Sequence, residues 1–405
     1  MHVMDFLLPG GALLLLSVIL LPRVREIPFW RASITPFASI IGSGFLIVAP
    51  LLGKIVGPET PWAMLLIVVV AYLIGGVIRF NIRYAEPRLA SGAAPSGQRF
   101  VEHLSNWGLL GAYVISVAFY LRLMSAFVLR GFDVTSETSA NALTTLVLLF
   151  IGITGWRRGL KGLERLELFS VSIKLVIIVA FLVGLAFHDA GTSLWVSIPH
   201  PPARPVGETL RMLAGMLLVV QGFETSRYLG HVYSADMRVR SMRFAQQISA
   251  VIYISFAFMI LPLIQYLSPA HFHETAIIDL SRHVSVVLPF MLIIAASMSQ
   301  FSAAIADTLG GGGLIADESR TKVSARIGYI TIAVCAIVLV WTTSIFEIIA
   351  FASRAFAFYY FGQTVLAFQI ASGLPNGRRR WLLLLGFGLL SGVLAWVTLY
   401  AIPVG

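Results

Sequence analysis

The chain has 405 residues, of which 58% are hydrophobic and only 12% are charged. This balance excludes an ordinary soluble globular protein, in which about a quarter of the residues are charged. The formal net charge is +10, but the charges lie mostly in short segments between apolar runs. That pattern is typical of membrane topology and not of a nucleic-acid-binding stripe, so we predict an integral membrane protein without a nucleic-acid partner.

Runs of about 20 apolar residues recur along the chain, each of them long enough to cross a bilayer as a helix. The first run, residues 6–21, lacks a basic leading region and a small-residue cleavage site, so we expect a helix and not a signal peptide. The predicted fold class is therefore an all-α integral membrane protein with twelve spans. The spans are expected at residues 6–22, 33–57, 61–84, 104–130, 141–157, 165–188, 208–226, 243–267, 284–307, 325–342, 345–371 and 381–402.

Basic residues alternate between the two sides of these spans. They are abundant in the segments that follow the first, third, fifth, seventh, ninth and eleventh spans, and scarce in the others. Because cytoplasmic loops carry an excess of Lys and Arg, this alternation predicts that both termini are extracytoplasmic. The expected location is the inner (plasma) membrane of a bacterium.

The second span, residues 33–57, contains Gly42, Ser43 and Gly44 in the middle of an apolar run. A helix interrupted at this depth exposes backbone N–H and C=O groups that lipid cannot satisfy, so the break survives only against protein or a wet cavity. N–H groups at the start of the second half-helix would suit an anionic group of a ligand. We therefore expect half of a substrate site here. The alternative is that the glycines only allow close helix packing.

The seventh span, residues 208–226, is interrupted by Gln221, Gly222 and Glu224. This break lies five spans after the first, and two interrupted helices at corresponding positions are typical of an inverted-repeat transporter. A carboxylate at this depth is costly unless it is paired or hydrated, which makes Glu224 a functional candidate. The alternative interpretation places Glu224 in water near the cytoplasmic end of the span, because Arg227 follows three residues later.

Five short motifs follow one another along the first two thirds of the chain. They are Ile41-Gly42-Ser43-Gly44-Phe45, Tyr84-Ala85-Glu86, Pro95-Ser96-Gly97, Leu168-Phe169-Ser170-Val171-Ser172-Ile173-Lys174-Leu175 and Gly222-Phe223-Glu224. In this order and spacing they resemble motifs of the amino acid–polyamine–organocation (APC) superfamily of secondary transporters. The resemblance covers residues 31 to 265 and beyond them rests on the pattern of spans.

The resemblance implies five-plus-five inverted repeats with one extra helix at each end of the chain. Residues 1–30 would hold the extra N-terminal helix, 31–190 the first repeat, 191–375 the second repeat and 376–405 the C-terminal helix. The binding site would lie mainly between the first, third, sixth, eighth and tenth helices of the repeats.

The resemblance also implies site residues. In relatives that carry amino acids, N–H groups of the first broken helix hold the substrate carboxylate, and carbonyl groups of the second hold its amino group. The matching residues are Gly42, Ser43 and Gly44 for the carboxylate, and Val219, Val220 and Gly222 for the amino group. The chain departs from many relatives in two places, since residues 218–221 include no aromatic gate residue and Asp307 stands where a Ser-Arg pair is common.

Lys174 lies about ten residues into the sixth span, roughly 15 Å along the helix axis. An ammonium group at that depth is costly. In sodium-independent relatives that resemble this chain, a lysine at the matching position takes the place of a bound cation, and we expect Ser299 and Ser302 beside it. The resemblance thus implies proton coupling or sodium-independent exchange. The alternative is a lysine that snorkels to the cytoplasmic interface.

Other features of the apolar runs are less specific. Arg122 and Arg354 lie inside spans, where they would favour an anionic ligand or a buried carboxylate partner. Glu347 is expected near the outer surface. The glycine run at residues 310–313 is a poor helix interior, so we expect a hinge or the exit from the membrane there.

We interpret the chain as a secondary active transporter of a small amino acid or related organic solute that works by alternating access. One alternative is a transporter of an organic or inorganic anion, which Arg122, Arg354 and the missing aromatic gate favour. Another is a membrane sensor with the same fold that does not transport. The expected partners are the small solute, the bilayer and, for coupling, a proton, while the oligomeric state is left open.

Enzymatic activity and cofactors are not expected. The histidines are scattered, and the nearest group, His271, His273 and Glu274, is expected in a hydrated loop and not at a metal. No nucleotide-binding motif supports ATP-driven pumping. The single cysteine, Cys335, excludes an intrachain disulfide and a cysteine-based metal site.

Overall fold

The computed structural model describes residues 4–42, 44–160, 165–190, 201–230, 232–266, 273–320 and 322–404. These residues form helices and no strand, so the all-α prediction is confirmed for them. The elements are α1 (Met4–Ile19), α2 (Pro22–Arg25), α3 (Pro28–Ile40), α4 (Gly44–Val56), η1 (Gly57–Glu59), α5 (Thr60–Tyr84), α6 (Glu86–Ala90), α7 (Ser96–Arg130), α8 (Glu137–Arg158), α9 (Arg165–Ala190), α10 (Val206–Ala214), η3 (Leu217–Val220), η4 (Phe223–Leu229), α11 (Ala235–Met259), α12 (Leu261–Ile264), α13 (Ala276–Arg282), α14 (Leu288–Glu318), α15 (Ala325–Thr342), α16 (Ile345–Ser372) and α17 (Arg378–Tyr400).

Eight segments of this described part are long and apolar enough to cross a membrane, judged by length and composition. The first, Pro28–Tyr84, contains α3, α4 and α5, and the others fall on α7, α8, α9, α14, α15, α16 and α17. The apolar helix α1 is shorter, with 16 residues. The chain is therefore an integral membrane protein, while the count of twelve spans stays a prediction.

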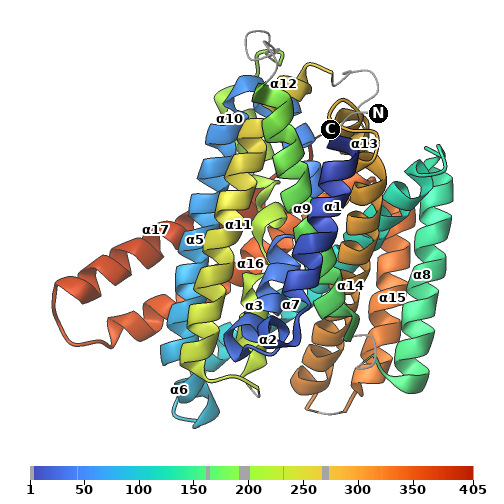
Figure 1. The fold of residues 1–405 in the computed structure, drawn as a ribbon. Helices are drawn as coiled ribbons and strands as arrows, with labels where there is room; N and C mark the ends of the chain where they lie inside the picture. The colour runs from blue at the N-terminus through green and yellow to red at the C-terminus, as the bar shows by residue number, and fades with distance from the viewer. Residues whose placement is uncertain are drawn as a thin grey trace.

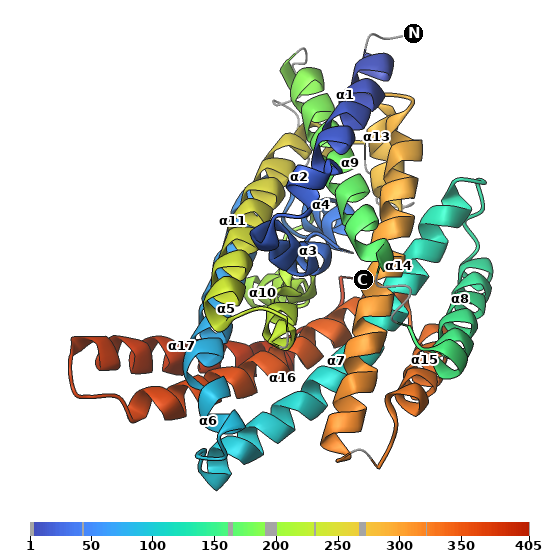
Figure 2. The ribbon, with the colours of Figure 1, turned by 60° about the horizontal axis from the view of Figure 1, so that its bottom comes forward.

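The helices form two groups (Figure 1). Both termini lie at one end of the bundle and α6 lies at the other, and we call these the terminal end and the α6 end. One group consists of α7, α8, α14 and α15, and the second contains α3, α5, α11 and η4. Helix α16 contacts α7 and α5, and it returns as α17 in a hairpin that projects sideways (Figure 2).

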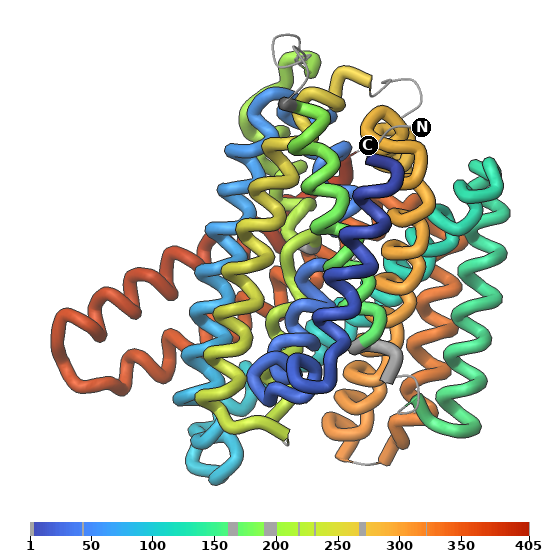
Figure 3. The backbone as a smooth tube through the Cα atoms, viewed as in Figure 1, coloured from blue at the N-terminus to red at the C-terminus, as the bar shows by residue number. Residues whose placement is uncertain are grey.

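The first helix, α1, packs along α9 (Figure 3). Gly184 of α9 makes room for it, because a Cβ atom there would lie 3.2 Å from Cδ1 of Leu8. Ser285, just before α14, donates a hydrogen bond of 2.5 Å to the buried Asp5. Helix α1 thus ties α9, which carries Lys174, to the start of α14.

The glycine run at residues 310–313 is helical, so the expectation of a poor helix interior there is wrong, while a hinge or membrane exit stays a prediction. Helix α14 continues through the run to Glu318. The reason is packing: a Cβ at Gly310 would lie 3.0 Å from the ring of Tyr113 on α7, and one at Gly311 would lie 2.7 Å from Ile332 on α15. The run lets α14 approach both neighbours closely, and that contact outweighs the low helix propensity of glycine.

Candidate functional site

The two interrupted helices touch at their interruptions. Helix α3 ends at Ile40 and α4 begins at Gly44, while η3 ends at Val220 and η4 begins at Phe223. A Cβ atom on Gly44 would lie 2.5 Å from both the Cα and the carbonyl oxygen of Val219, so only glycine fits there. Ser43 lies outside the described residues. We call this contact region the crossing.

Gly222 fits the crossing from the other side. A Cβ atom on it would overlap the Cβ of Ser39 in the last turn of α3, and its φ of 107° lies in the left-handed region that favours glycine. Gly42 ends the first half-helix, where its N–H donates to the carbonyl of Ser39 at 3.2 Å. The glycines of both motifs are therefore required by backbone contact and backbone conformation.

Tyr253 of α11 joins the two half-helices. Its hydroxyl lies 2.9 Å from the carbonyl oxygen of Ile40 and 2.7 Å from that of Val219, and its side chain is fully buried. One hydroxyl hydrogen shared by two carbonyls satisfies backbone groups that the breaks remove from the helical ladders. The carbonyl of Val219 thus has a protein partner in this structure.

Val220 is buried beside the crossing. With Ile40, Gln246 and Tyr253 it lines a cavity of about 20 Å³. That volume is enough for about one water molecule. In this state the crossing is closely packed.

Lys174 reaches the first half-helix from α9. Its side chain is 1% exposed. Its Nζ donates to the carbonyl oxygen of Ala38 at 2.5 Å and to Oγ of Ser299 on α14 at 3.2 Å. The ammonium group therefore lies between α3 and α14 and does not snorkel to an interface. Ser302 is buried one turn further along α14, and its hydroxyl donates to the carbonyl of Ser299.

Glu224 is 1% exposed and bonded to groups of the protein. Its Oε2 accepts hydrogen bonds from the N–H of Gly222 at 3.0 Å and from the hydroxyl of Tyr360 on α16 at 2.6 Å. The ring of Tyr360 also stacks on Phe223, with 5.3 Å between the ring centroids. The carboxylate thus closes the turn at Gly222 and fastens η4 to α16.

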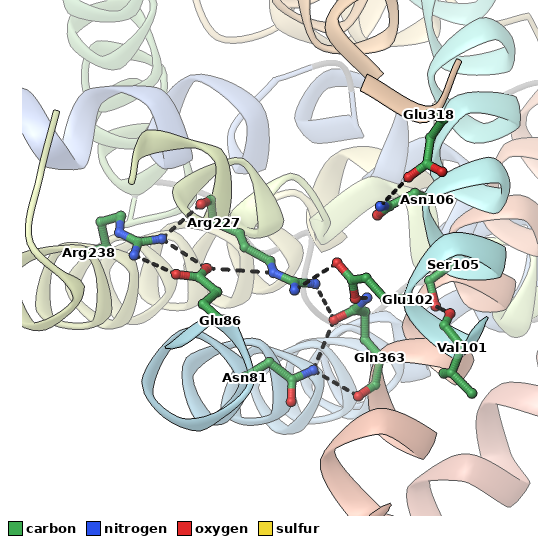
Figure 4. A network of polar contacts seen from close by, with 10 residues as sticks. All are labelled: Asn81, Glu86, Val101, Glu102, Ser105, Asn106, Arg227, Arg238, Glu318 and Gln363. Atoms are coloured by element: carbon green, nitrogen blue, oxygen red, sulfur yellow. Dashed lines mark hydrogen bonds and ion pairs between the residues drawn. The ribbon is translucent and has the colours of Figure 1, made fainter. Parts of the chain in front are cut away.

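A polar network ties η4 to its neighbours at the α6 end (Figure 4). Arg227 forms ion pairs with Glu102 of α7 at 2.9 Å and with Glu86 of α6 at 3.6 Å. Glu86, the acidic residue of the Tyr84-Ala85-Glu86 motif, also pairs with Arg238 of α11 at 2.6 Å. Gln363 of α16 accepts a short hydrogen bond from Arg227. Four different helices are thus linked to η4 by polar contacts at the α6 end.

A second set of charge pairs lies at the terminal end. Arg122 is 4% exposed and pairs with Glu274 at 3.2 Å and with Glu137 at 3.7 Å. A cavity of about 290 Å³ lies beside these residues. The partners of Arg122 are therefore carboxylates at the terminal end of the bundle, away from the crossing.

Asp279 of α13 adds two ion pairs at the terminal end. It pairs with Arg130 at 2.5 Å and with His273 at 3.3 Å. Burial acts to raise the pKa of Asp279, but hydrogen bonds and charges from His273 and Arg130 act against it more strongly, so its pKa is lowered. The described residues contain no group of three or more side chains that could hold a metal, and His271 lies outside them.

The remaining intramembrane charges do not reach the crossing. Arg354 is half-buried, and its Nε donates to the carbonyl of Thr398 on α17 at 2.8 Å. Glu347 is exposed at the start of α16, where it forms a capping box with Ser344. Of the candidate residues, the structure therefore brings Gly42, Gly44, Val219, Val220, Gly222, Glu224, Lys174, Ser299 and Ser302 to the crossing and its immediate neighbours, and leaves out Arg122 and Arg354.

Comparisons with known proteins agree with this arrangement. A family model described as APC superfamily transporter matches residues 22–401. A protein of Aquifex aeolicus (strain VF5), described as uncharacterized, is 43% identical over 399 residues, which is 98% of this chain and 96% of that protein. The fold resembles that of a Na⁺-coupled sialic acid symporter solved in a substrate-bound outward-open state, with a TM-score of 0.55, 14% identity and 99% coverage of both chains.

Proposed function

The chain belongs to the APC superfamily of transporters, and from this premise we propose that it carries a small amino acid or a related organic solute by alternating access, without a requirement for sodium. The observation that carries the proposal is the crossing, where two interrupted helices meet inside the bundle. Interrupted helices at this depth supply the backbone donors and acceptors that hold a solute in transporters built from inverted repeats.

The proposed binding groups are those of the two breaks. N–H groups of Gly42, Ser43 and Gly44 would face the carboxylate of an amino acid, and carbonyl groups at Val219, Val220 and Gly222 would face its amino group. In the closed state the carbonyl of Val219 accepts a bond from Tyr253 instead. Solute entry would therefore replace the Tyr253 contact, because a carbonyl left without any partner in the protein interior costs about 1–3 kcal/mol.

Lys174 supports the absence of sodium coupling. Its ammonium group lies between α3 and α14, within hydrogen-bonding distance of Ala38 and Ser299. A sodium ion about 4 Å from it would be repelled by about 4 kcal/mol at an effective dielectric constant of about 20. The resemblance to a sodium-coupled symporter concerns the fold, since the two chains share 14% identity. Exchange or coupling to protons would then drive the cycle.

Alternating access would move one helix group against the other. We propose that α3, α4, α5, α11 and the broken helix around η4 form the moving bundle, and that α7, α8, α14 and α15 form the frame. Five-plus-five repeats at residues 31–190 and 191–375 would produce this division. Opening of the α6 end, which we assign to the cytoplasm from the distribution of Arg and Lys, would break the Arg227–Glu102 pair.

An anionic solute gains no support from the arginines that suggested it. Arg122 is neutralised by Glu274 and Glu137, and Arg354 binds a backbone carbonyl on α17. The side chains closest to the second break include a carboxylate, Glu224, which would repel an anion. We therefore retain the amino acid class.

A thermal-shift screen of the purified protein tests the solute class. It covers amino acids, amines, carboxylates and inorganic anions, each in sodium-containing and sodium-free buffer. A solute present at about 100 times its Kd stabilises the folded state by about 2.7 kcal/mol. The proposal predicts stabilisation by an amino acid class that is equal in both buffers. Stabilisation by anions alone, or only with sodium, would contradict it.

A further inference from the structure

Asp307 is a buried carboxylate that the proposed solute contacts do not use. It lies in the interior of α14, which runs from Leu288 to Glu318, roughly 28 Å from the start of the helix and roughly 16 Å from its end. Its side chain is 6% exposed. Its Oδ2 accepts a hydrogen bond of 2.5 Å from the hydroxyl of Ser116 on α7. A carboxylate at this depth is costly unless something neutralises it.

The groups around Asp307 are hydroxyls and a second carboxylate. Helix α7 contributes Ser116 and Tyr113, η4 contributes Glu224, and the tyrosines at 359 and 360 lie on α16 around Glu224. No ion pair joins Asp307 or Glu224 to a basic side chain within the described ranges. Lys174 of α9 contacts α14 at Ser299, which lies about two helical turns from Asp307.

A second buried polar group lies on the same face of α14. Gln300 precedes Asp307 by seven residues, so the two side chains point to the same side of the helix. Gln300 is fully buried, and neither its amide nitrogen nor its amide oxygen has a hydrogen-bond partner among the residues described. An unsatisfied amide in a membrane-protein interior is costly, and such groups mark places where another molecule, such as water, completes the bonding.

We propose that Asp307 is the proton-binding site of the transport cycle, with Ser116 as the residue that positions its carboxyl group. The inference rests on the proposed function, because a transporter without sodium needs either exchange or another coupling ion. In each cycle one proton from water on one side forms an O–H bond with Asp307, and the same bond breaks to release the proton on the other side. The unsatisfied amide of Gln300, on the same face of α14, is a place where water would bind.

The position of Asp307 explains how a proton would control the conformational change. Asp307 lies on the frame helix α14, and Glu224 lies on the broken helix of the moving bundle, within electrostatic range of it. Two charged carboxylates in this low-dielectric region repel each other strongly. One bound proton removes that repulsion and allows η4 to close against the frame.

Infrared difference spectroscopy tests the site without any solute. The wild-type protein in lipid, changed from high to low pH, is expected to show the C=O stretching band of a buried protonated carboxyl group. Asp307→Asn removes this band, and Ser116→Ala keeps the band but moves the pH at which it appears. Asp317→Asn, an exposed aspartate at the end of the same helix, leaves the band unchanged. A band that persists in Asp307→Asn, or that is lost in Glu224→Gln instead, overturns the proposal.

Proteoliposomes loaded with a pH-sensitive dye test the coupling. The probe is a mixture of the proteinogenic amino acids with radioactive label, added in sodium-free medium. With one proton per solute, a gradient of about one pH unit supports about tenfold accumulation. Asp307→Asn is expected to abolish accumulation and proton entry while exchange of labelled for unlabelled amino acids continues. Undiminished gradient-driven accumulation in Asp307→Asn overturns the proton site.

The two experiments separate this inference from the proposed function. If the wild-type protein moves no amino acid, the proposed function fails, and the infrared band still decides whether Asp307 binds a proton. Thermal unfolding of each variant in detergent shows that it is folded. Asp307→Glu, which keeps the carboxyl group, is expected to restore part of the proton entry, and a failure of Asp307→Glu that matches Asp307→Asn in a folded protein counts against a proton-carrying role.

Discussion

The ammonium nitrogen of Lys174 lies 2.5 Å from the carbonyl oxygen of Ala38, although the two residues are 136 positions apart in the chain. Ala38 belongs to the last turn of α3, two residues before that half-helix ends. The lysine therefore supplies a charged donor at the point where the helix loses its own hydrogen-bond ladder. It stabilises the break and occupies the space between α3 and α14.

Replacement of Lys174 by alanine is expected to lower the free energy of unfolding by about 1.5–3 kcal/mol, the range for a hydrogen bond that involves a charged group. Amino acid uptake should fall, because the half-helix loses its support from α9. Its dependence on pH should change, because the variant removes a positive charge about two helical turns from Asp307. Unfolding in detergent and uptake at several pH values measure the two effects. The control, Lys322→Ala, changes an exposed lysine and should alter neither. Normal uptake with an unchanged pH profile in Lys174→Ala would refute the assigned role.

Gly222→Ala is expected to be destabilising by about 3 kcal/mol or more, because its φ of 107° strains any L-residue and the added Cβ would overlap Ser39. The midpoint of thermal unfolding measures the effect. Gly207→Ala is the control, since Gly207 lies in α10, ahead of the break, and has open space where its Cβ would be. Equal stability of the two variants would show that the crossing is not closely packed.

Tyr253→Phe removes one hydroxyl from the crossing and leaves the carbonyls of Ile40 and Val219 without that donor. We expect a loss of about 1–3 kcal/mol of stability, as for buried acceptors left unsatisfied. Tyr400→Phe, at an exposed position, should stay within about 0.5 kcal/mol of the wild type. If a bound solute replaces the Tyr253 contact, Tyr253→Phe should also bind amino acids at least as tightly as the wild type, which the thermal-shift screen measures.

Glu102→Gln removes the charge that pairs with the buried Arg227. Loss of one partner costs about 3–5 kcal/mol where the other charge is left unpaired and less here, because Arg227 keeps Glu86, so the α6 end should open more often. A cysteine introduced at the buried Ser226, in a Cys335→Ala background, should then react faster with a water-soluble maleimide. Arg83→Gln, which removes an exposed pair with Asp236, should leave the reaction rate unchanged. An unchanged rate in Glu102→Gln would mean that this network does not hold the end closed.

The Asp279 cluster predicts how acid affects the terminal end. The pKa of Asp279 is lower in the folded protein than its ordinary value, so its charge stabilises the fold above the ordinary carboxyl pKa of about 3.9. This contribution is lost as the pH falls through that value toward the lower folded pKa. Between about pH 6 and about pH 3, the free energy of unfolding should therefore fall less steeply in Asp279→Asn than in the wild type. Identical slopes would contradict the assigned direction.

The two helix breaks and the importance of Lys174 could be predicted because the residues that indicate them stand out in the sequence itself. Glycines and charges inside an apolar run, such as Gly42, Gly222 and Lys174, are visible without any knowledge of what lies beside them. Glu224 was equally visible, but whether water or protein surrounds it depends on Tyr360, which lies 136 residues away.

Partners across the bundle could not be predicted in this way. In the sequence, Tyr253 is an ordinary aromatic residue of an apolar helix. Only the packing of α11 shows that its hydroxyl contacts the carbonyls of Ile40 and Val219 at the two helix breaks. The expectation of a poor helix interior at residues 310–313 failed for the same reason, because helix propensity is local and the contact of Gly310 with Tyr113 is not. In the sequence Arg227 indicates the cytoplasmic end of a span, and its burial between Glu102 and Glu86 follows from the packing of α6 and α7.

Uptake of labelled amino acids by sodium-free proteoliposomes addresses the proposed function directly. The wild-type protein should take up one class of amino acid in a saturable manner, at the same rate when choline replaces sodium on both sides. Vesicles with Gly222→Ala should show a much lower rate, because the crossing is disrupted. No uptake by folded wild-type protein, or uptake that appears only with sodium, would contradict a sodium-independent amino acid transporter.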